Sequence, residues 1–384
     1  MTRIDIDAPT PLLGGLSPQR FMQRHWQKKP LLVRQALPMT TPLVGRSQLF
    51  ALAARDDVES RLVVHGNRGW ALRQGPFPRR ALPPLSRAKW TLLVQGLDLH
   101  LDAAHALMSR FRFVPDARID DVMVSYATDG GGVGPHFDSY DVFLLQTHGT
   151  RRWRIGRLAQ PELEPGVPLK ILRNFVPEQE WLLEPGDMLY LPPRWAHDGV
   201  AEGECMTCSI GFRSAARAEL AHELLQRMLD LDDAPQDDVR YRDPRQQATR
   251  EPARIPPALG AFGAEAVARH QPTARSLSRS LGEVLSEPKP GVWFEAVDDF
   301  DAAQSLGGVH LDRRTRMLYD DTHVFINGES FDASGRDARL MRSLADARVL
   351  GAAQLAQLSP AARSLVTEWV GAGWLHALPA ERQE

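Results

Sequence analysis

One short segment, GPHFDSYDVFLLQTHGTRRW at residues 134–153, contains side chains that could bind both a metal ion and an anion. It begins with His136 and Asp138, one residue apart, and it ends with Arg151 and Arg152. Residues two apart in a β-strand project from the same face, so this segment, as a strand, would point His136 and Asp138 into one pocket. An imidazole and a carboxylate are two ligands of the 2-His-1-carboxylate facial triad, which binds Fe(II) and leaves three positions open.

A third ligand must come from a later part of the chain, and His197 is the best candidate. It follows EPGDMLYLPP at residues 184–193, a tight turn into a short strand that a jelly roll would bring beside an earlier strand. An isolated His-x-Asp arises easily by chance, but its combination with a glycine-rich approach, an arginine and a later histidine is specific. Four other histidines lack such surroundings and are expected to be structural: His65, His100, His105 and His148.

The arginines suggest what else the pocket holds. Fe(II) with three open positions suits a bidentate 2-oxo acid and dioxygen, and the distal carboxylate of 2-oxoglutarate would need a cation deeper in the pocket. In RRWRI, Arg151 shares a strand face with Trp153 and Ile155, whereas Arg152 lies on the opposite face. The apolar face is the inward one, so the pattern predicts that Arg151 is the buried cation.

The elements around these residues are mainly strands. Between residues 120 and 212, short apolar segments alternate with Gly and Pro turns, which indicates a sandwich or barrel. Residues 136–146 and 151–156 are predicted as two strands separated by THGT. A helix follows at 214–231, and its apolar residues recur at helical spacing. These are Leu220, Leu224, Met228 and Leu231.

Composition favours an ordinary folded protein of two or three domains. The chain has 384 residues, 43% of them hydrophobic and 24% charged, with a formal net charge of −2. No global basic field would attract it to nucleic acid or to a membrane. Its two cysteines, Cys205 and Cys208, allow no disulfide framework and lie on opposite strand faces, so both are interpreted as structural. The sequence shows neither a secretory signal nor a membrane-spanning apolar run, and we expect a cytoplasmic protein.

Taken together, these motifs resemble the JmjC/cupin-type 2-oxoglutarate oxygenases. The resemblance covers nearly the whole chain and is greatest to the bacterial ribosomal oxygenases, which hydroxylate an arginine of ribosomal protein uL16. It includes HWQKKPLLVRQA, GGGVGPHFDSYDVFLLQ, GTRRWRIG, LEPGDMLYLPPRWAHDG and SIGFRS. The resemblance implies that His136, Asp138 and His197 bind Fe(II), that Arg151 binds 2-oxoglutarate, and that O2 is consumed.

The resemblance also implies an α+β multidomain architecture. A double-stranded β-helix barrel of the jelly-roll, cupin or JmjC type would occupy residues 1–213, a helical dimerisation segment and linker 214–275, and a winged-helix-like domain 276–384. We therefore expect a homodimer. The RRTR cluster at residues 313–316 is short and is followed by Asp320 and Asp321, which favours protein contact or scaffolding over direct DNA binding.

The strand DDVMVSYAT would line the substrate pocket. Asp121, Met123 and Ser125 share one face of it: Asp121 could pair with a substrate guanidinium, Met123 could line the pocket or simply the core, and Ser125 could hydrogen-bond the cosubstrate. Tyr140 lies two residues beyond Asp138 and could form a wall for the stem of an arginine. Ser209 is a weaker candidate for a cosubstrate contact.

The residues thus predict an Fe(II)- and 2-oxoglutarate-dependent protein hydroxylase, and the resemblance implies that it acts on an arginine of uL16. Two alternatives remain open. One is an oxygenase of the same chemistry that acts on a histidine or a small molecule. The other is a non-catalytic metal-binding cupin with a regulatory winged helix, which would not require Arg151 and should bind specific DNA.

Overall fold

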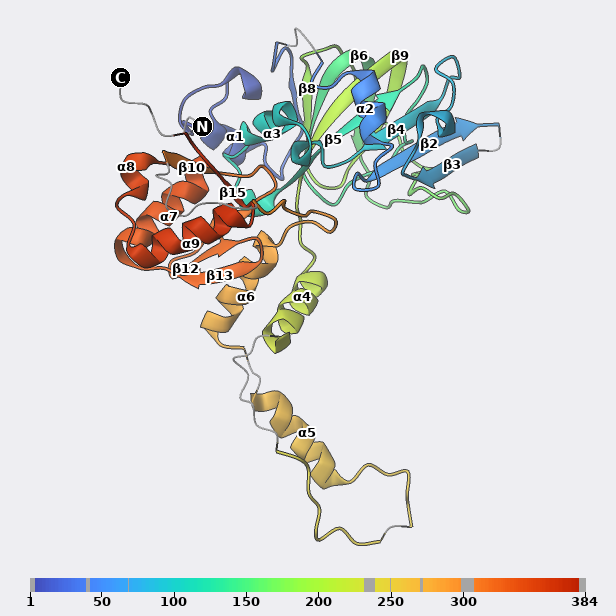
Figure 1. Cartoon of the computed structure of the whole chain (residues 1–384). Helices are drawn as coiled ribbons and strands as arrows, with labels where there is room; N and C mark the ends of the chain where they lie inside the picture. The colour runs from blue at the N-terminus through green and yellow to red at the C-terminus, as the bar shows by residue number, and fades with distance from the viewer. Residues whose placement is uncertain are drawn as a thin grey trace.

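The computed structural model describes residues 4–38, 42–67, 69–230, 239–248, 250–269, 272–297 and 307–379. Figure 1 shows two folded bodies, the barrel domain formed by the first half of the chain and a C-terminal domain, with an arm of helices below them. Within the described residues, no helix is both long and apolar enough to span a bilayer.

The barrel domain is built on one curved nine-stranded sheet. Its hydrogen-bonded order is β1-β8-β6-β9-β5-β4-β2-β3, and β7 pairs with β6 outside this path. The strands are β1 (Leu31–Val33), β2 (Ser60–Gly66), β3 (Gly69–Gln74), β4 (Trp90–Val94), β5 (Ile119–Ala127), β6 (Val142–Arg157), β7 (Gln179–Leu183), β8 (Met188–Leu191) and β9 (Trp195–Phe212). The helices are η1 (Pro11–Leu13), α1 (Pro18–Arg24), α2 (Arg46–Leu52), η2 (Arg79–Ala81), η3 (Leu97–Leu99), α3 (Asp102–Ser109) and η4 (Asp116–Arg118).

Two strands differ from their predicted form. The segments predicted as separate strands before and after THGT belong to one strand, β6, because β6 pairs with β9 on both sides of that segment. Two register irregularities around His148 absorb the interruption, and Gly149 supplies the left-handed backbone there with φ +58°. The cupin-type barrel expected from the short strands is confirmed, and its longest strands carry the site.

Alternation along the strands separates two apolar layers. Val122, Val124 and Tyr126 of β5 face the main core, where they meet the buried Phe21 of α1 and other aromatic residues. The opposite faces of β6 and β9 enclose the barrel interior, which contains Trp153, Ile155 and Trp195. The site described below lies in this interior.

The C-terminal half begins with three helices and continues as a small α/β domain. The helices of the arm are α4 (Arg217–Asp230), α5 (Pro257–Arg269) and α6 (Ala274–Ser286). They are followed by β10 (Gly308–Leu311), β11 (Met317–Tyr319), β12 (His323–Ile326), β13 (Glu329–Asp332), α7 (Gly335–Ala347), β14 (Val349–Gly351), α8 (Ala352–Leu355), α9 (Pro360–Gly371) and β15 (Leu375–Ala377).

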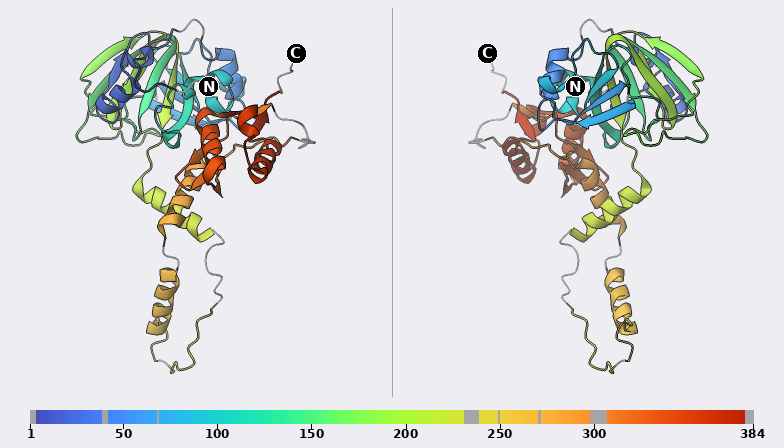
Figure 2. Two further views of the ribbon diagram at one scale, coloured as in Figure 1. Left: turned by 90° about the vertical axis from the view of Figure 1, so that its left-hand side faces the viewer. Right: turned by 90° about the vertical axis from the view of Figure 1, so that its right-hand side faces the viewer.

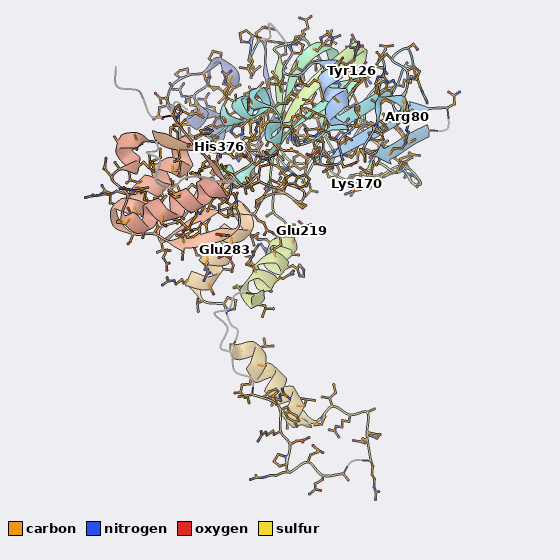
Figure 3. All side chains as sticks on the ribbon, in the orientation of Figure 1. Arg80, Tyr126, Lys170, Glu219, Glu283 and His376 are labelled. Atoms are coloured by element: carbon orange, nitrogen blue, oxygen red, sulfur yellow. The ribbon has the colours of Figure 1, made fainter. Side chains whose placement is uncertain are left out.

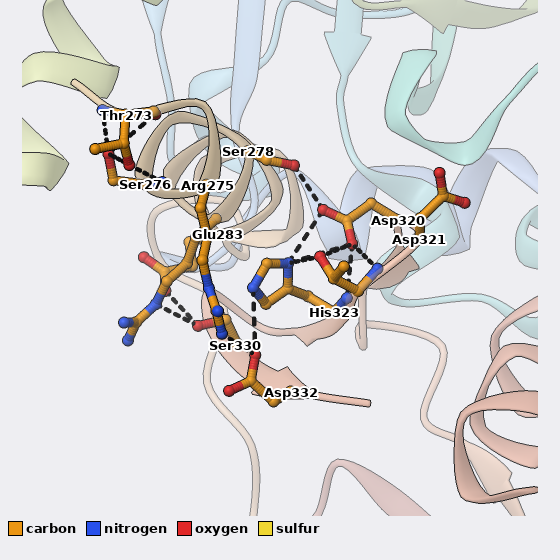
Figure 4. Close-up of polar contacts among 12 residues, drawn as sticks. Thr273, Arg275, Ser276, Ser278, Glu283, Asp320, Asp321, His323, Ser330 and Asp332 are labelled. Atoms are coloured by element: carbon orange, nitrogen blue, oxygen red, sulfur yellow. Dashed lines mark hydrogen bonds and ion pairs between the residues drawn. The ribbon is translucent and has the colours of Figure 1, made fainter. Parts of the chain in front are cut away.

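Polar contacts attach α6 to the β11–β13 sheet (Figure 4). The two ring nitrogens of His323 face carboxylate oxygens of Asp320 and Asp332 at 3.2 and 3.5 Å. Ser278 of α6 donates to Asp320 at 2.6 Å, and Ser330 of β13 donates to Glu283 of α6 at 2.6 Å. Asp320, one of the acidic neighbours of RRTR, therefore has a structural role inside the C-terminal domain.

α4 carries the apolar stripe that the sequence places in the expected dimerisation segment, and this helix packs within its own chain. α4 packs against α6 of the same chain, and Leu224 is the residue of α4 that this packing buries, whereas Leu220 and Met228 are half-buried. Leu231 lies outside the described residues. The apolar side chains that remain exposed on α4 are instead Leu225 and Leu229. In Figures 1, 2 and 3, α5 and the segment before it stand clear of both folded domains.

Candidate metal and cosubstrate site

The His-x-Asp segment lies in a loop, which corrects the prediction that it forms a strand. Residues 137–141 have no strand structure, and His136 makes only a single bridge, to His197 of β9. In that bridge His136 N donates to His197 O at 2.9 Å, and His197 N donates to His136 O at 2.7 Å. The backbone of Asp138 is held separately, because Arg194 N donates to Asp138 O at 2.8 Å. The bridge, and not strand alternation, brings the two histidines together.

A buried aspartate anchors the end of this loop. Asp141 is fully buried and accepts hydrogen bonds from Tyr190 Oη at 2.6 Å and Gln27 Nε2 at 3.1 Å. Its backbone carbonyl accepts from Phe212 N at 3.1 Å. Sequence reasoning missed Asp141, because its partners lie 114 and 49 residues away along the chain. Buried carboxylates need such partners, so Asp141 fixes the loop that carries the metal-binding candidates.

His136, Asp138 and His197 converge, as predicted. One potential ligand atom from each lies within 4.8 Å of the others, and among the residues described no other group of three fits a metal ion. His136 Nδ1 contacts Gly134 O at 2.9 Å, and His197 Nδ1 contacts Trp195 O at 2.9 Å. A carbonyl can only accept, so both Nδ1 atoms carry the proton and both Nε2 lone pairs are free for a metal.

The protonation state of His197 also suits a cation. Burial and then charge repulsion by His136 lower the pKa of His197 to about 4, so His197 is neutral at pH 7. His197 Nε2 lies 3.7 Å from Asp138 Oδ2. Two imidazoles and one carboxylate form the ligand set of a divalent metal with open positions.

Arg151 is the buried cation that the strand faces predicted. Its side chain is only 5% exposed, and its Nη1 donates to Ser125 Oγ at 3.1 Å. Its Nε and Nη2 have no hydrogen-bond partner, and no carboxylate lies within 4 Å of it in the described parts of the chain. Arg152, in contrast, is partly exposed and pairs with Glu180 and Glu202. A buried guanidinium without an anion is costly, so this part of the barrel is built to receive one.

Trp153 adds a donor to the same interior. Its ring lies 5.8 Å from the Arg151 guanidinium and 5.9 Å from the His197 ring, and its buried indole N–H has no partner. Gly199 faces it across β6 and β9, and a Cβ at Gly199 would lie 2.7 Å from the indole ring. The strand alternation that placed Arg151 on the inward face also placed Trp153 there, but sequence reasoning did not identify its indole N–H as a free donor in the interior.

The two serines lie at different depths around Arg151. Ser125 pairs in register with Thr207 of β9, whose backbone carbonyl accepts from Ser125 Oγ at 3.4 Å. Ser209 is buried two residue pairs further along, opposite Met123 and Leu144. Met123 itself is half-buried. Only Ser125 contacts the guanidinium, which makes it the stronger of the two cosubstrate candidates.

Asp121 lies near the metal site, and Lys289 of the C-terminal half of the chain contacts it as well. Its Oδ2 accepts from Gly96 N at 3.3 Å and lies 3.4 Å from Lys289 Nζ, whereas its Oδ1 has no hydrogen bond among the described residues. Burial, then Asp138 and then Asp121 raise the pKa of Tyr140, so this phenol, 39% exposed, lies near both carboxylates. Sequence reasoning did not find Lys289, which follows α6 and is distant in the chain.

The cysteines have the structural positions expected of them. Both thiols are free and buried. Cys205 packs with Ala127 and Ala201, and Cys208 packs in the main core, so the two face opposite sides of β9. Burial raises the pKa of Cys208, which makes it unreactive as a thiolate.

Comparisons with known proteins agree with this site. Residues 106–220 match the JmjC domain family, and residues 268–376 match the ROXA-like winged helix family. The chain is 33% identical over 340 residues to the ribosomal protein uL16 3-hydroxylase of Escherichia coli K12, covering 83% of this chain and 86% of that one. It is 38% identical over 204 residues to a probable ribosomal oxygenase of Haemophilus influenzae, covering about half of each protein.

Solved structures show the same relationship. The ribosomal oxygenase YcfD from E. coli, in complex with cobalt and 2-oxoglutarate, superimposes with a TM-score of 0.76 at 29% identity, over 95% of this chain and 99% of that one. A further structure of E. coli YcfD gives a TM-score of 0.80 at 29% identity and covers 94% and 98% of the two chains. The chain therefore belongs to the ribosomal oxygenase family of JmjC proteins.

Proposed function

We propose that this protein is an Fe(II)- and 2-oxoglutarate-dependent hydroxylase that modifies an arginine of ribosomal protein uL16. The observation that carries the proposal is the pairing of the His136–Asp138–His197 cluster with an unpaired buried guanidinium in the same barrel. Family membership supports the substrate, because the E. coli relative is a uL16 3-hydroxylase. A ribosomal substrate also leads us to infer a cytoplasmic location.

The chain's residues would divide the reaction between them. His136, Asp138 and His197 hold the metal through Nε2, a carboxylate oxygen and Nε2. Arg151 and Ser125 bind the distal carboxylate of 2-oxoglutarate, and Trp153 closes the interior around it. Bound iron supplies the activation of O2, with 2-oxoglutarate converted to succinate and CO2 and one oxygen atom inserted into a substrate C–H bond. No protein side chain needs to act as a nucleophile.

Recognition of an arginine would use the residues between the metal and the C-terminal domain. Asp121 Oδ1 is available to accept a guanidinium N–H, although its Oδ2 is already held by Gly96 and Lys289. Tyr140 lies close to both Asp138 and Asp121 and is partly exposed, so an aliphatic stem could lie along its ring. Met123, on the same face of β5, and Ser209 would complete the wall.

Mass spectrometry of uL16 tests the proposed reaction. Wild-type enzyme with Fe(II), 2-oxoglutarate and O2 is expected to add one oxygen atom to an arginine, whereas His136→Ala, Asp138→Ala and His197→Ala are expected to add none, because each removes a metal ligand. His148→Ala is the matched control, since His148 is exposed on β6 and should leave the product unchanged. An oxidised histidine, or no oxidised residue in uL16, would contradict the proposal.

Arg151 and Arg152 provide a neighbouring pair with opposite expected effects. Arg151→Met is expected to weaken 2-oxoglutarate binding about a hundredfold, because roughly 3 kcal/mol of charge-assisted hydrogen bonding to the distal carboxylate is lost. Arg152→Met should change binding less than twofold, since Arg152 faces Glu180 and Glu202 outside the barrel. Calorimetry with the metal-loaded protein measures both, and a larger effect at Arg152 would show that the roles assigned to the two strand faces are wrong.

We further propose that the arm pairs two copies of the chain. Support comes from apolar side chains that stay exposed in the arm: Leu225 at 53% and Leu229 at 63% on α4, Ile255 at 73% just before α5, and Val267 at 74% on α5. Exposed apolar surface of this kind marks an interaction site, and twofold dimers are the commonest oligomers. The C-terminal domain would then serve protein contacts, with direct DNA binding not expected.

Substitutions on the exposed face of α4 test the dimer. The double variant Leu225→Asp and Leu229→Asp is expected to be monomeric and to hydroxylate uL16 more slowly, while 2-oxoglutarate turnover without substrate is less affected. Gln226→Asp adds one negative charge at a neighbouring exposed position without removing an apolar side chain, and it should remain dimeric. Light scattering at micromolar concentration is the measurement, and a monomeric wild-type protein would exclude the arm as a dimer interface.

A further inference from the structure

A cavity lies where the C-terminal domain meets the barrel domain, away from the metal site. The barrel side supplies η3, α3 and the start of β5, and the C-terminal side supplies the RRTR turn between β10 and β11 together with Arg348 at the end of α7. Its volume of about 80 Å³ is several times the space that one water molecule needs. The two domains are joined around it, since Arg112 Nη1 donates to Asp346 O at 2.7 Å.

Most charged groups around this cavity are already paired. Every pair joins one cation to a carboxylate within 3 Å, and two of them, Lys289–Asp120 and Arg313–Asp102, cross between the domains. The pairs are Arg112–Asp116 at 2.5 Å, Arg313–Asp102 at 2.9 Å, Arg314–Asp312 at 2.8 Å and Lys289–Asp120 at 2.9 Å. The two charges in each pair neutralise each other, so these pairs do not require a further ion.

Two guanidiniums are the exceptions. Arg316 lines the cavity, and its guanidinium has no hydrogen bond or ion pair within the part of the chain that is described, although the residue is at least half-buried. Arg348 donates only to backbone carbonyls, those of Thr315 and Asp312, with no carboxylate as its partner. Neither guanidinium forms an ion pair among the described residues, although the carboxylates of Asp98, Asp116 and Asp120 act on Arg316 from nearby.

Burial is the largest cause of the pKa shifts around the cavity, and neighbouring cations add to it. Burial and the charge of Arg213 lower the pKa of Arg316 to about 10, although aspartates nearby act in the opposite direction. Burial and Arg112 lower the pKa of Arg348 to about 10. Burial and then Arg348 lower the pKa of His105 to about 4, and the buried Nδ1 of His105 has no partner. An anion in the cavity would relieve all three groups.

We propose that this interdomain cavity binds a single phosphate group, held by Arg316 and Arg348. A guanidinium presents two parallel N–H donors that match the oxygens of a phosphate, and two such groups line this one cavity. Both arginines belong to the C-terminal domain, and the barrel domain contributes His105 of α3, whose Nδ1 has no partner, to the same cavity. The phosphate could come from free inorganic phosphate or from the backbone of an RNA.

Thermal unfolding of the full chain, without metal or 2-oxoglutarate, tests the site. Inorganic phosphate is added at constant ionic strength, with chloride as the balancing salt. The Tm of the wild-type protein is expected to rise and saturate with phosphate, since a ligand that binds only the folded state stabilises it. Arg316→Met is expected to bind phosphate at least tenfold more weakly, yet to unfold no lower than wild type in chloride, because it removes an unpaired charge.

Two further variants and an RNA-binding experiment complete the test. Arg336→Met removes an exposed arginine of α7 and should respond to phosphate like wild type. Arg316→Lys keeps the charge but loses the fork, so it should weaken phosphate binding even where the methionine variant does not fold. Competition of phosphate with a short labelled RNA assigns the source to RNA, and phosphate binding without RNA binding assigns it to the free ion. A response to phosphate no greater than to chloride, or one unchanged in both Arg316 variants, would overturn the proposal.

Discussion

The interior of the barrel depends on one uncompensated charge, the buried guanidinium of Arg151. Among the described residues its one hydrogen bond is to Ser125 Oγ and its aromatic neighbour is Trp153, while Nε and Nη2 have no partners. A dianionic cosubstrate would supply the missing interactions and would be held by its distal end. Such a contact leaves the other end of the molecule free to chelate a metal at the His136–Asp138–His197 cluster. On the proposed function, the cosubstrate would therefore supply the negative charge that the buried guanidinium lacks in the free protein.

The rest of the fold keeps that charge and the metal ligands in fixed relation. β6 carries Arg151, and β9 carries His197 four rungs further along the same pair of strands, where Arg151 lies opposite Ala201 and Ile155 opposite His197. The backbone bridge to His136 connects the loop to β9, and the buried Asp141 holds the end of that loop. The C-terminal domain reaches the same region through Lys289, so the proposed substrate contact and the packing of the domains would share Asp121.

The period of two along the strands correctly predicted the features that depend on which face of a strand a residue occupies. The inward position of Arg151, the outward position of Arg152 and the opposite faces of the two cysteines all follow from a period of two. It was wrong for His136 and Asp138, because a single bridge followed by a loop has no period to detect. The stripe on α4 correctly marked a buried face, but periodicity does not identify the partner, which is α6. Lys289 and Asp141 act through contacts between residues distant in the chain, for which the sequence has no local signal.

The most direct test of this account compares two cosubstrates on the same protein. 2-Oxobutanoate keeps the chelating 2-oxo acid of 2-oxoglutarate but lacks the distal carboxylate, so it should bind the metal and leave Arg151 unpaired. Calorimetry with the Fe(II)-loaded protein in the absence of O2 measures both affinities. The account predicts that 2-oxoglutarate binds about a hundredfold more tightly, a difference of roughly 3 kcal/mol. Equal affinities would contradict it, because the buried guanidinium would then contribute nothing to cosubstrate binding.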